Sequence, residues 1–249
     1  MENVNGDDDR ELTPKEKTDA RGKVGALLWI SLVTRPDISF DVNALSSEVS
    51  KGTVKTVKEI NRVISNAKVR KNKLKFVKLG DIYKLCVKVY ADASYANQDG
   101  ATRSTGGRVI MLKKREEDLV KSKKIARVYR SVKAAETRAL DDALDEAIHV
   151  ARVVKEVYEG RIDLKDPAQI PVEAFTDNKS PWESIYNTRQ CEERLLRNLI
   201  AGLKELLELK MVETVKWVPT EKQLADCLTK KGKKGDWLLR VASLNLLDE

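Results

Sequence analysis

The segment from about residue 131 to residue 158 places the strongest constraint on the fold. Its small and apolar residues recur at helical spacing and predict one amphipathic helix. The buried stripe of that helix is expected to contain Ala135, Ala139, Ala143, Ala147, Val150, Val154 and Val157. Because alanine has almost no side chain, a stripe so rich in it allows very close approach, and we expect the helix to pack against a sheet.

Alternation of apolar and polar residues on both sides of this helix predicts the strands of that sheet. Strands are expected in LKFVKL (74–79), YKLCVKVYADAS (83–94), RSTGGRVIMLKK (103–114), LVKSKKIARV (119–128), PVEAFTD (171–177) and VETVKWVP (212–219). The second and third should pair across the turn at 97–100. Helices are expected at 181–186, at 195–206 and around 223–229. This order predicts an α/β fold in which a mixed sheet carries helices on its faces.

The pattern before residue 74 is helical instead. Residues 1–13 are polar and acidic and are expected to form a flexible leader. Three helical segments follow, the second of which starts at Pro36, and they predict a small helical unit over 14–75. The α/β domain should then occupy 76–249, since a chain of 249 residues can bury one or two cores.

Charge and cysteine content exclude some classes of protein. The longest apolar run, residues 24–33, is too short to cross a hydrocarbon core of about 30 Å, and no membrane association is expected. The three cysteines are scattered without a paired motif, which argues against a disulfide framework and a zinc site. Residues 51–80 contain ten basic residues and one acidic residue. This run is typical of a surface that binds a polyanion such as nucleic acid, or of a merely solvated face.

Four acidic residues fall where a carboxylate site can form. Asp92 and Asp177 end two predicted strands, Glu136 lies in the second turn of the long helix, and Asp226 lies in the last predicted helix. If the two strands are parallel neighbours, both aspartates emerge at the carboxyl edge of the sheet, where α/β folds usually bind ligands. Carboxylates without histidine or thiolate suit Mg²⁺ or Mn²⁺ rather than zinc. An aspartate after a strand is also a common turn residue, so position alone leaves both interpretations open.

Five segments of the chain resemble the successive ribonuclease H motifs of copia-type retrotransposon polyproteins. They are VYADASYAN (89–97), RSTGG (103–107), RSVKAAETRAL (130–140), AFTDNKS (174–180) and WVPTEKQLADCLTKKG (217–232). Upstream, ELTPKEK (11–17) and GALLWISLVTRPDISFDVNALS (25–46) resemble the segment that follows the polymerase palm in the same polyproteins. The resemblance implies a ribonuclease H-like fold, with a mixed five-stranded sheet flanked by helices and preceded by a helical unit similar to a reverse transcriptase thumb.

The resemblance also implies a reaction and a catalytic, metal-binding quartet. The acids of the family carry over to Asp92 in YADAS, Glu136 in AAET, Asp177 in TDN and Asp226 in LAD. The implied reaction is endonucleolytic hydrolysis of the RNA strand of an RNA/DNA hybrid, with two Mg²⁺ or Mn²⁺ ions about 4 Å apart on the scissile phosphate. One ion would activate the attacking water and the other would stabilise the departing 3′ oxygen, with Asp92 as the ligand that bridges both.

The same resemblance implies the context in which the chain acts. Its partner would be the upstream reverse transcriptase palm and fingers of the same polyprotein. Its location would be intracellular, in the cytoplasm, a virus-like particle or the nucleus. We expect no polymerase activity from this chain alone, because Asp141 and Asp142, the only paired aspartates that resemble a polymerase motif, lie inside a helix and are expected to be solvated.

Nucleic-acid contacts are expected from basic and polar residues near the acids and on the third helix. Strand choice requires groups that sense 2′-hydroxyls on one strand and phosphates on the other. The candidates are Ser94, Asn97, Arg103, Ser104 and Asn178 near the acids, Lys123, Lys124, Arg127 and Arg130 before the long helix, and Lys55, Lys58 and Arg62 on the third helix. Each is equally well explained as a turn or surface residue. Trp182 and Trp217 are expected to pack in or beside the core rather than to stack on bases.

Two departures from the family leave a second interpretation open. Many ribonucleases H use a histidine in a loop before their last aspartate, whereas this chain has no histidine between residues 177 and 226. Its single histidine, His149, is expected on the helix surface. Residues 187–202 also lack the His-Ile-Asp string common in the family, with Asn198 near the usual acid. The alternative function is a catalytically weak or inactive retroelement-derived fragment that binds nucleic acid. Integrase-type recombinases and four-acid exonucleases share the fold class, but their acids lie in other motifs.

Overall fold

A mixed sheet forms the centre of the C-terminal part of the chain. The computed structural model describes residues 8–69, 78, 80–94, 104–114, 132–160, 170–187, 193–230 and 238. The sheet contains β1 (Leu85–Ser94), β2 (Thr105–Lys114), β3 (Val172–Thr176) and β4 (Thr214–Trp217) in the order β2-β1-β3-β4. Strand β1 is antiparallel to β2 and parallel to β3, and β3 is parallel to β4. The predicted α/β class, the mixed sheet and the hairpin of β1 and β2 are therefore confirmed.

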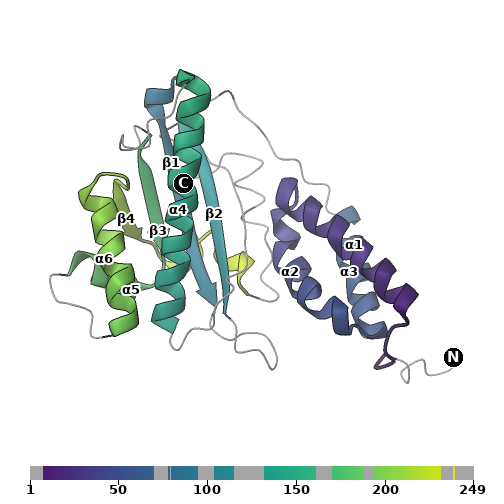
Figure 1. The fold of residues 1–249 in the computed structure, drawn as a ribbon. Helices are drawn as coiled ribbons and strands as arrows, with labels where there is room; N and C mark the ends of the chain where they lie inside the picture. Colours follow the sequence, from purple (N-terminus) through teal and green to yellow (C-terminus); the bar gives the residue numbers. More distant parts are fainter. Residues whose placement is uncertain are drawn as a thin grey trace.

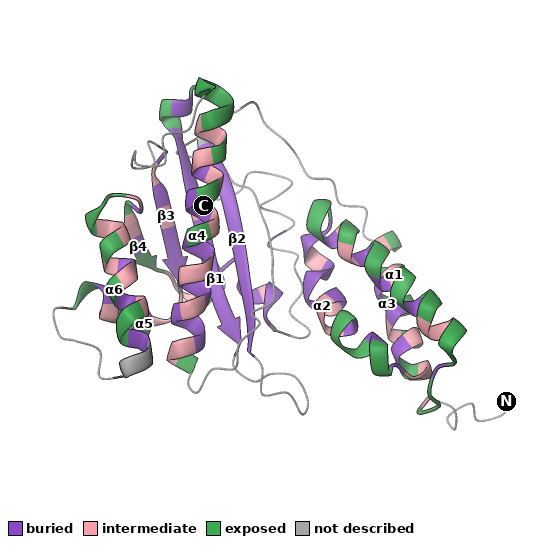
Figure 2. Cartoon of the chain, viewed as in Figure 1, coloured by how far each residue is buried: buried purple, intermediate pink, exposed green. Residues whose placement is uncertain are grey.

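Four strands are described where five were expected. The strand predicted within 119–128 lies outside the described residues, and so do residues 74–77 and 79 of the earliest predicted strand. A short 3₁₀ helix, η3 (Ile82–Lys84), leads directly into β1. Strand β1 lies between β2 and β3, and it is buried along nearly its whole length (Figure 2).

One face of the sheet is covered by helices α4 (Val132–Glu159), α5 (Lys179–Tyr186) and α6 (Arg194–Glu208) (Figure 1). The alanines of the predicted stripe of α4 lie in this interface: Ala143 and Ala147 are fully buried against apolar residues of β1 and β3, such as Val87 and Val172. The prediction is wrong for Val157 near the end of the helix, which is 81% exposed. Trp182 of α5 packs against the same core and donates a hydrogen bond from its indole nitrogen to the Val215 carbonyl oxygen (3.1 Å). The small residues of α4 allow this helix to pack closely on a sheet face that is rich in valine.

The opposite face of the sheet is covered by the segment that follows β4. Leu224, Ala225 and Leu228 pack there against Tyr90 and Met111. The helix predicted around 223–229 is wrong: the segment contains the single 3₁₀ turns η4 (Thr220–Lys222) and η5 (Asp226–Leu228). The physical reason is Gln223, whose backbone is extended and whose side chain is hydrogen-bonded to the backbone of both Ala91 and Ala225. These bonds hold the segment flat on the sheet.

The N-terminal part forms a three-helix unit of α1 (Pro14–Val33), α2 (Ser39–Glu48) and α3 (Val54–Val69), with the 3₁₀ turns η1 (Pro36–Ile38) and η2 (Val49–Lys51) on either side of α2. Helix α1 begins with a capping box, in which the side chains of Thr13 and Glu16 each accept a hydrogen bond from the other's backbone N–H. A buried ion pair between Arg35 and Asp37 ties η1 to α3, because Arg35 also donates to the Ala67 carbonyl oxygen.

Residues 8–13 differ from the flexible leader expected over 1–13. Leu12 is buried in the core of the helical unit, and its N–H donates to the Gly52 carbonyl oxygen (3.2 Å). A bridge between Glu11 and Thr53 and an ion pair between Asp8 and Lys58 add to this attachment. A single buried leucine therefore anchors an otherwise polar segment to the chain at the start of α3.

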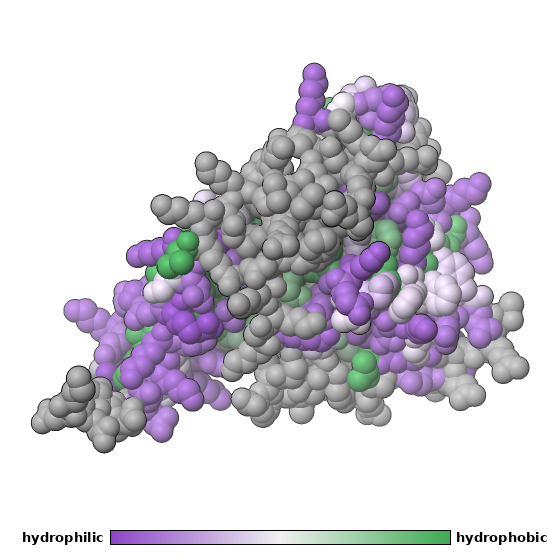
Figure 3. All heavy atoms as spheres, turned by 180° about the vertical axis from the view of Figure 1, so that it is seen from behind, coloured by the Kyte–Doolittle hydropathy of each residue, from purple (hydrophilic) through white to green (hydrophobic). Residues whose placement is uncertain are grey.

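The helical unit contacts the C-terminal domain through η1 and α2, which pack against η5. Figure 1 shows α2 beside the turn that follows β4. Seen from behind, the helical unit presents a mostly hydrophilic surface (Figure 3). Within the described ranges, none of the helices has the length and apolar character needed to span a bilayer.

Candidate acidic site

Asp92 and Asp177 lie at the carboxyl ends of two parallel neighbouring strands. Asp92 is near the end of β1, and Asp177 directly follows β3. The register pairs Tyr90 with Phe175, so the two aspartates occupy equivalent levels two residues further on. Asp92 is 2% exposed and Asp177 is partly buried. The geometry is the one that places ligand sites at the carboxyl edge of α/β sheets.

Glu136 approaches the same edge from helix α4. It is 7% exposed, and its Oε2 accepts a hydrogen bond from the backbone N–H of Ala93 (3.0 Å). Ala135 and Ala139 pack against Ala93 at this point. Three small side chains therefore let the first turns of α4 come close enough to β1 for a carboxylate to reach its backbone.

Asp226 reaches the site from η5 on the other face of the sheet, and it is 4% exposed. Hydrogen bonds attach this segment to β1: the Ser94 hydroxyl donates to the Thr229 carbonyl oxygen (2.8 Å), and the Gln223 amide donates to the Ala91 carbonyl oxygen (2.9 Å). The Thr229 hydroxyl donates to Asp92 Oδ2, which joins two of the acid-bearing segments directly.

Gly107 of β2 makes this close approach of η5 possible. It pairs with Asp92 in the sheet. A Cβ atom at position 107 would lie 2.8 Å from Leu228 Cβ, 2.8 Å from Thr229 Cγ2 and 2.9 Å from the Ala225 carbonyl oxygen. The second glycine of the RSTGG motif therefore leaves room for the segment that carries Asp226.

The four carboxylates form one electrostatically coupled cluster. Burial raises the pKa of Glu136 to about 9, and the charges of Asp92 and Asp177 add to this increase. Burial also raises the pKa of Asp92 to about 6, reinforced by Asp177 and Asp226 and opposed by the Thr229 hydroxyl and the Lys230 ammonium group. Buried carboxylates that repel one another are the arrangement that a bound cation relieves.

Lys230 and Thr229 are site residues that the sequence reasoning missed. The Lys230 ammonium group donates to Asp226 Oδ1, and its charge also acts on Asp92, Glu136 and Asp177. Both residues lie within the same WVPTEKQLADCLTKKG string as Asp226: Thr229 is three positions after it and Lys230 is four. Their short distance from the predicted acid was the available signal, since polar residues three and four positions after an acid on a turn can fold back over it.

The edge of the site beside Asp177 is lined by Thr220 and Trp217. The Thr220 hydroxyl donates to Asp177 Oδ2 (2.9 Å), and the Trp217 indole N–H donates to the Asp177 carbonyl oxygen (2.8 Å). The ammonium group of Lys179 lies over the Trp217 ring, 4.8 Å from its centroid. Trp217 is 38% exposed, so it packs at the rim of the domain, whereas Trp182 packs in the core.

The candidate nucleic-acid contacts near the acids have separate outcomes. Ser94 is buried and bonded to Thr229, and Ser104 is fully buried, so neither presents a free polar group to solvent. Asn178 caps α5 by accepting the Ser180 N–H (3.0 Å). The remaining candidates lie outside the described residues: Asn97, Arg103, Lys123, Lys124, Arg127 and Arg130.

The basic residues of the third helix, α3, are exposed, but two of the three candidates are in ion pairs. Lys58 pairs with Asp8, and Arg62 pairs with Glu59 and Asp41. Lys55 is exposed on the first turn. The positive charge that α3 offers to a polyanion is therefore smaller than the sequence count indicates.

The paired aspartates of α4 differ from the prediction that they are solvated. Asp141 and Asp142 both pair with Arg138 (2.9 and 2.7 Å) and are only 18% and 27% exposed. Burial raises the pKa of Asp141 to about 6. His149 is exposed on the same helix, as expected. The Asp141–Asp142 pair is thus part of an ion-pair network within one helix.

The donor chemistry of the four acids fits a hard divalent cation. Carboxylate oxygens are the ligands that Mg²⁺ and Mn²⁺ prefer, and two of the four carboxyls here are destabilised as anions by burial and by one another. In the present side-chain arrangement, the described part of the chain contains no group of three or more histidine, cysteine, aspartate or glutamate side chains that could hold a metal ion. The metal-binding role of the quartet stays a prediction.

The sheet and the buried cluster at its carboxyl edge define an α/β protein with a candidate carboxylate site. Over 215 residues, or 86% of the chain, the sequence is 27% identical to the retrovirus-related Pol polyproteins from transposons RE1 and RE2 of Arabidopsis thaliana. The predicted resemblance to copia-type retrotransposon polyproteins is thereby confirmed. The chain spans only 14% of the length of these curated relatives. No protein-family model matches it.

Solved structures similar to this chain include two ribonuclease H domains. The N-terminal RNase H domain of a Mycobacterium tuberculosis protein aligns with a TM-score of 0.42 and 18% identity, covering 58% of this chain and 91% of that one. RNase H1 from Halobacterium salinarum NRC-1 aligns with a TM-score of 0.41 and 18% identity, covering 57% and 93%. These TM-scores are too low to carry an argument, so the fold rests on the strand order and packing of this chain.

Proposed function

We propose that this chain hydrolyses the RNA strand of RNA/DNA hybrids, as the ribonuclease H part of a retrotransposon polyprotein. One observation carries the proposal: Asp92, Glu136, Asp177 and Asp226 come from four separate elements and converge at the carboxyl edge of β1 and β3. The similarity to retrotransposon Pol polyproteins supports it, and so do the motifs in which the four acids lie.

The four acids would hold Mg²⁺ or Mn²⁺, with two ions in the proposed site. When bound, such ions supply an activated water and charge stabilisation for the departing oxygen. Other residues of the chain position these carboxylates. Thr229 orients Asp92, Thr220 orients Asp177, and the Ala93 N–H orients Glu136. Because Glu136 has a pKa of about 9, it must lose a proton when it becomes a ligand, and metal binding should release protons at neutral pH.

The substrate and partners follow from the same proposal. A hybrid would lie across the carboxyl edge of the sheet, where the half-exposed Trp217 and Lys179 border Asp177. The upstream palm and fingers of the polyprotein would deliver the hybrid, and the proposed compartment is the cytoplasm, a virus-like particle or the nucleus. Lys55 on α3 is the described candidate for a phosphate contact upstream of the site.

The second candidate function is nucleic-acid binding with weak or no cleavage. The specific observation in its favour is the loop between β4 and η5, where many ribonucleases H have a histidine and this chain has none. Here Thr220, which cannot act as an acid or base near neutral pH, contacts Asp177 instead. The two functions predict different behaviour of the same hybrid.

The test is cleavage of a labelled RNA/DNA hybrid with and without Mg²⁺, together with hybrid binding. The wild-type chain should cut only the RNA strand and only with the metal. Asp92→Asn should lower cleavage by about 10³-fold or more while hybrid affinity changes little, because losing one ligand disables the metal site. Asp145→Asn is a matched control at an exposed position of α4 and should cut normally. Retained Mg²⁺-dependent cleavage by Asp92→Asn would overturn the assignment, and binding without cleavage by the wild type would favour the second function.

A further inference from the structure

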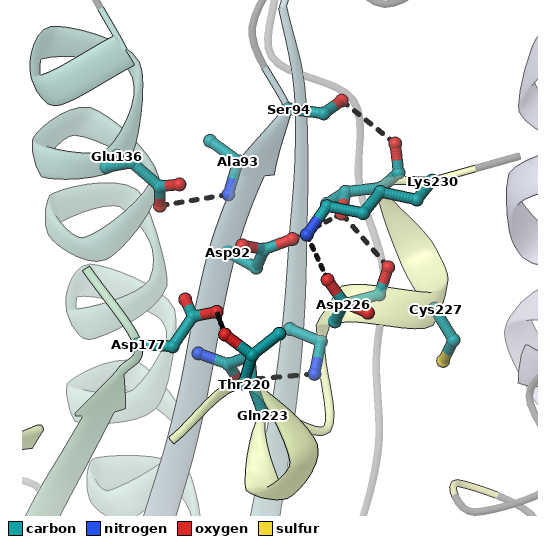
Figure 4. Close-up of polar contacts among 12 residues, drawn as sticks. Asp92, Ala93, Ser94, Glu136, Asp177, Thr220, Gln223, Asp226, Cys227 and Lys230 are labelled. Atoms are coloured by element: carbon teal, nitrogen blue, oxygen red, sulfur yellow. Dashed lines mark hydrogen bonds and ion pairs between the residues drawn. The ribbon is translucent and has the colours of Figure 1, made fainter. Parts of the chain in front are cut away.

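Lys230 places a positive charge inside the acidic cluster. Its ammonium group donates to Asp226 Oδ1, and Figure 4 shows it between Asp226 and Asp92. Its charge also acts on Asp177 and Glu136. The side chain is 40% exposed, whereas that of Asp226 is 5% exposed. Lys230 therefore forms an ion pair with Asp226 and partly compensates the negative charge of the other carboxylates.

We propose that the Lys230 ammonium group is an internal counter-ion that competes with divalent metal ions for the carboxylates and thereby sets the metal affinity of the site. This inference rests on the proposed function, because it concerns the ions that the four acids would hold. The Lys230 ammonium group and a bound Mg²⁺ or Mn²⁺ ion would compete for the same carboxylate oxygens. Metal binding must then break the ion pair of Lys230 with Asp226.

The first argument for this role is electrostatic. Carboxylates that are buried and close together cannot all be ionised without a cation nearby. The lysine carries one positive charge and donates to Asp226, whereas four carboxyl groups meet at this edge of the sheet, so its charge compensates the cluster only in part. A cluster compensated in part still attracts a divalent ion, and the lysine lowers that attraction without abolishing it.

The second argument is mechanical. The backbone beside Lys230 is fixed, because the Thr229 carbonyl oxygen accepts a hydrogen bond from Ser94 and the Thr229 hydroxyl donates to Asp92. The lysine side chain, by contrast, has a flexible four-carbon stem and reaches solvent. It can leave the cluster by rotation of its own side-chain bonds, while the hydrogen bonds of Thr229 keep the backbone of this segment on β1. Displacement by a metal ion therefore does not require the fold to open.

The test compares Mn²⁺ binding by the full-length wild-type chain and by Lys230→Met, measured calorimetrically without nucleic acid. Methionine keeps most of the apolar stem and removes the charge. Lys230→Met should bind Mn²⁺ about tenfold more tightly, because it no longer has to break a half-buried ion pair. It should also have a lower melting temperature without metal, because its carboxylates then repel one another more strongly. Lys230→Arg, which keeps the charge, should bind close to the wild type.

Control and outcomes separate this inference from the proposed function. Lys84→Met removes the same charge at an exposed position at the opposite end of β1 and should leave Mn²⁺ affinity unchanged. Equal or weaker Mn²⁺ binding by Lys230→Met, with clear binding by the wild type, overturns the counter-ion role and leaves the metal site standing. A merely structural lysine gives this weaker binding, since its loss would disturb the acids. If neither the wild-type chain nor Lys230→Met binds Mn²⁺, both the inference and the proposed metal site are wrong. If Lys230→Met does not fold, Lys230→Gln takes its place with the same expected result.

Discussion

Substitution of Gly107 by alanine tests whether the contact between β2 and η5 holds the acidic cluster together. The added Cβ would lie within 3.0 Å of three atoms, and one of them is a backbone oxygen that cannot rotate away. Overpacking of a dense site costs about 3 kcal/mol at the upper end of its usual range, and replacing glycine in a strand returns about 0.5–1 kcal/mol. We therefore expect Gly107→Ala to lower the free energy of unfolding by about 2 kcal/mol. For a domain of this size the melting temperature should fall by roughly 4–8 °C.

The same substitution should affect the site more than the fold, because η5 has to move away from the sheet and carries Asp226 with it. A displacement of about 1 Å at a catalytic group costs on the order of 100-fold in rate. Urea unfolding, Mn²⁺ titration and hybrid cleavage measure the two effects separately. Gly202→Ala in α6 is the control: a Cβ there meets nothing within 4 Å, so it should stabilise by about 0.5–1 kcal/mol without changing cleavage. Stability and cleavage of Gly107→Ala within error of the wild type would refute the reasoning.

Three further substitutions test the electrostatics of the chain. The pKa of Glu136 is about 9 against an ordinary 4.5, so the folded chain binds more protons than the unfolded chain, and stability should fall as pH rises from about 5 to 9. Glu136→Gln should remove this dependence above about pH 6, because below that pH the raised pKa values of Asp92 and Asp141 also contribute. It should stabilise the chain at pH 8 by on the order of a few kcal/mol in urea unfolding with EDTA; an unchanged pH profile contradicts it. Arg35→Ala should cost about 3–5 kcal/mol, because it leaves Asp37 buried without its partner, and the loss should be visible as early melting of the helical unit by circular dichroism. Lys55→Gln should reduce the slope of log affinity for the hybrid against log salt concentration by about 0.7–0.9. Lys58→Gln should change this slope less, because Lys58 is already paired with Asp8. Equal slopes for the wild type and both variants would exclude α3 from the interface.

Periodicity was enough to predict the elements whose packing is regular. The alanine stripe of α4, the hairpin of β1 and β2 and the short helix α5 all follow from local spacing, and the structure has them where the spacing predicts them. The parallel pairing of β1 with β3 was only a condition in the sequence argument. Strand neighbours far apart in the chain are chosen by the whole sheet, so no local pattern could establish it.

Segments held by side-chain to backbone bonds were harder to predict. The region 223–229 has apolar residues at helical spacing, yet Gln223 and Thr229 use their side chains to bond β1, and the chain forms single turns instead of a helix. Leu12 shows the same limit at the N-terminus, where one apolar residue in an acidic stretch is enough to anchor it. Such contacts depend on partners 40 or more residues away, which local propensity does not contain.

The protonation of the acids depends on a still finer level of structure. Motifs single out Asp92 and Glu136 equally, but the structure gives them pKa values of about 6 and about 9. Burial raises both pKa values, and the difference arises because the Thr229 hydroxyl and the Lys230 charge lower the pKa of Asp92, whereas the pKa of Glu136 is raised by Asp92 and Asp177 and lowered only by the Ala93 N–H and, least of all, by Lys230. At neutral pH the metal-free cluster therefore keeps a proton on Glu136. In the proposed metal site, Glu136 would give up that proton and Lys230 would leave Asp226 when a divalent ion binds, so metal affinity should rise with pH and should rise again when the lysine charge is removed.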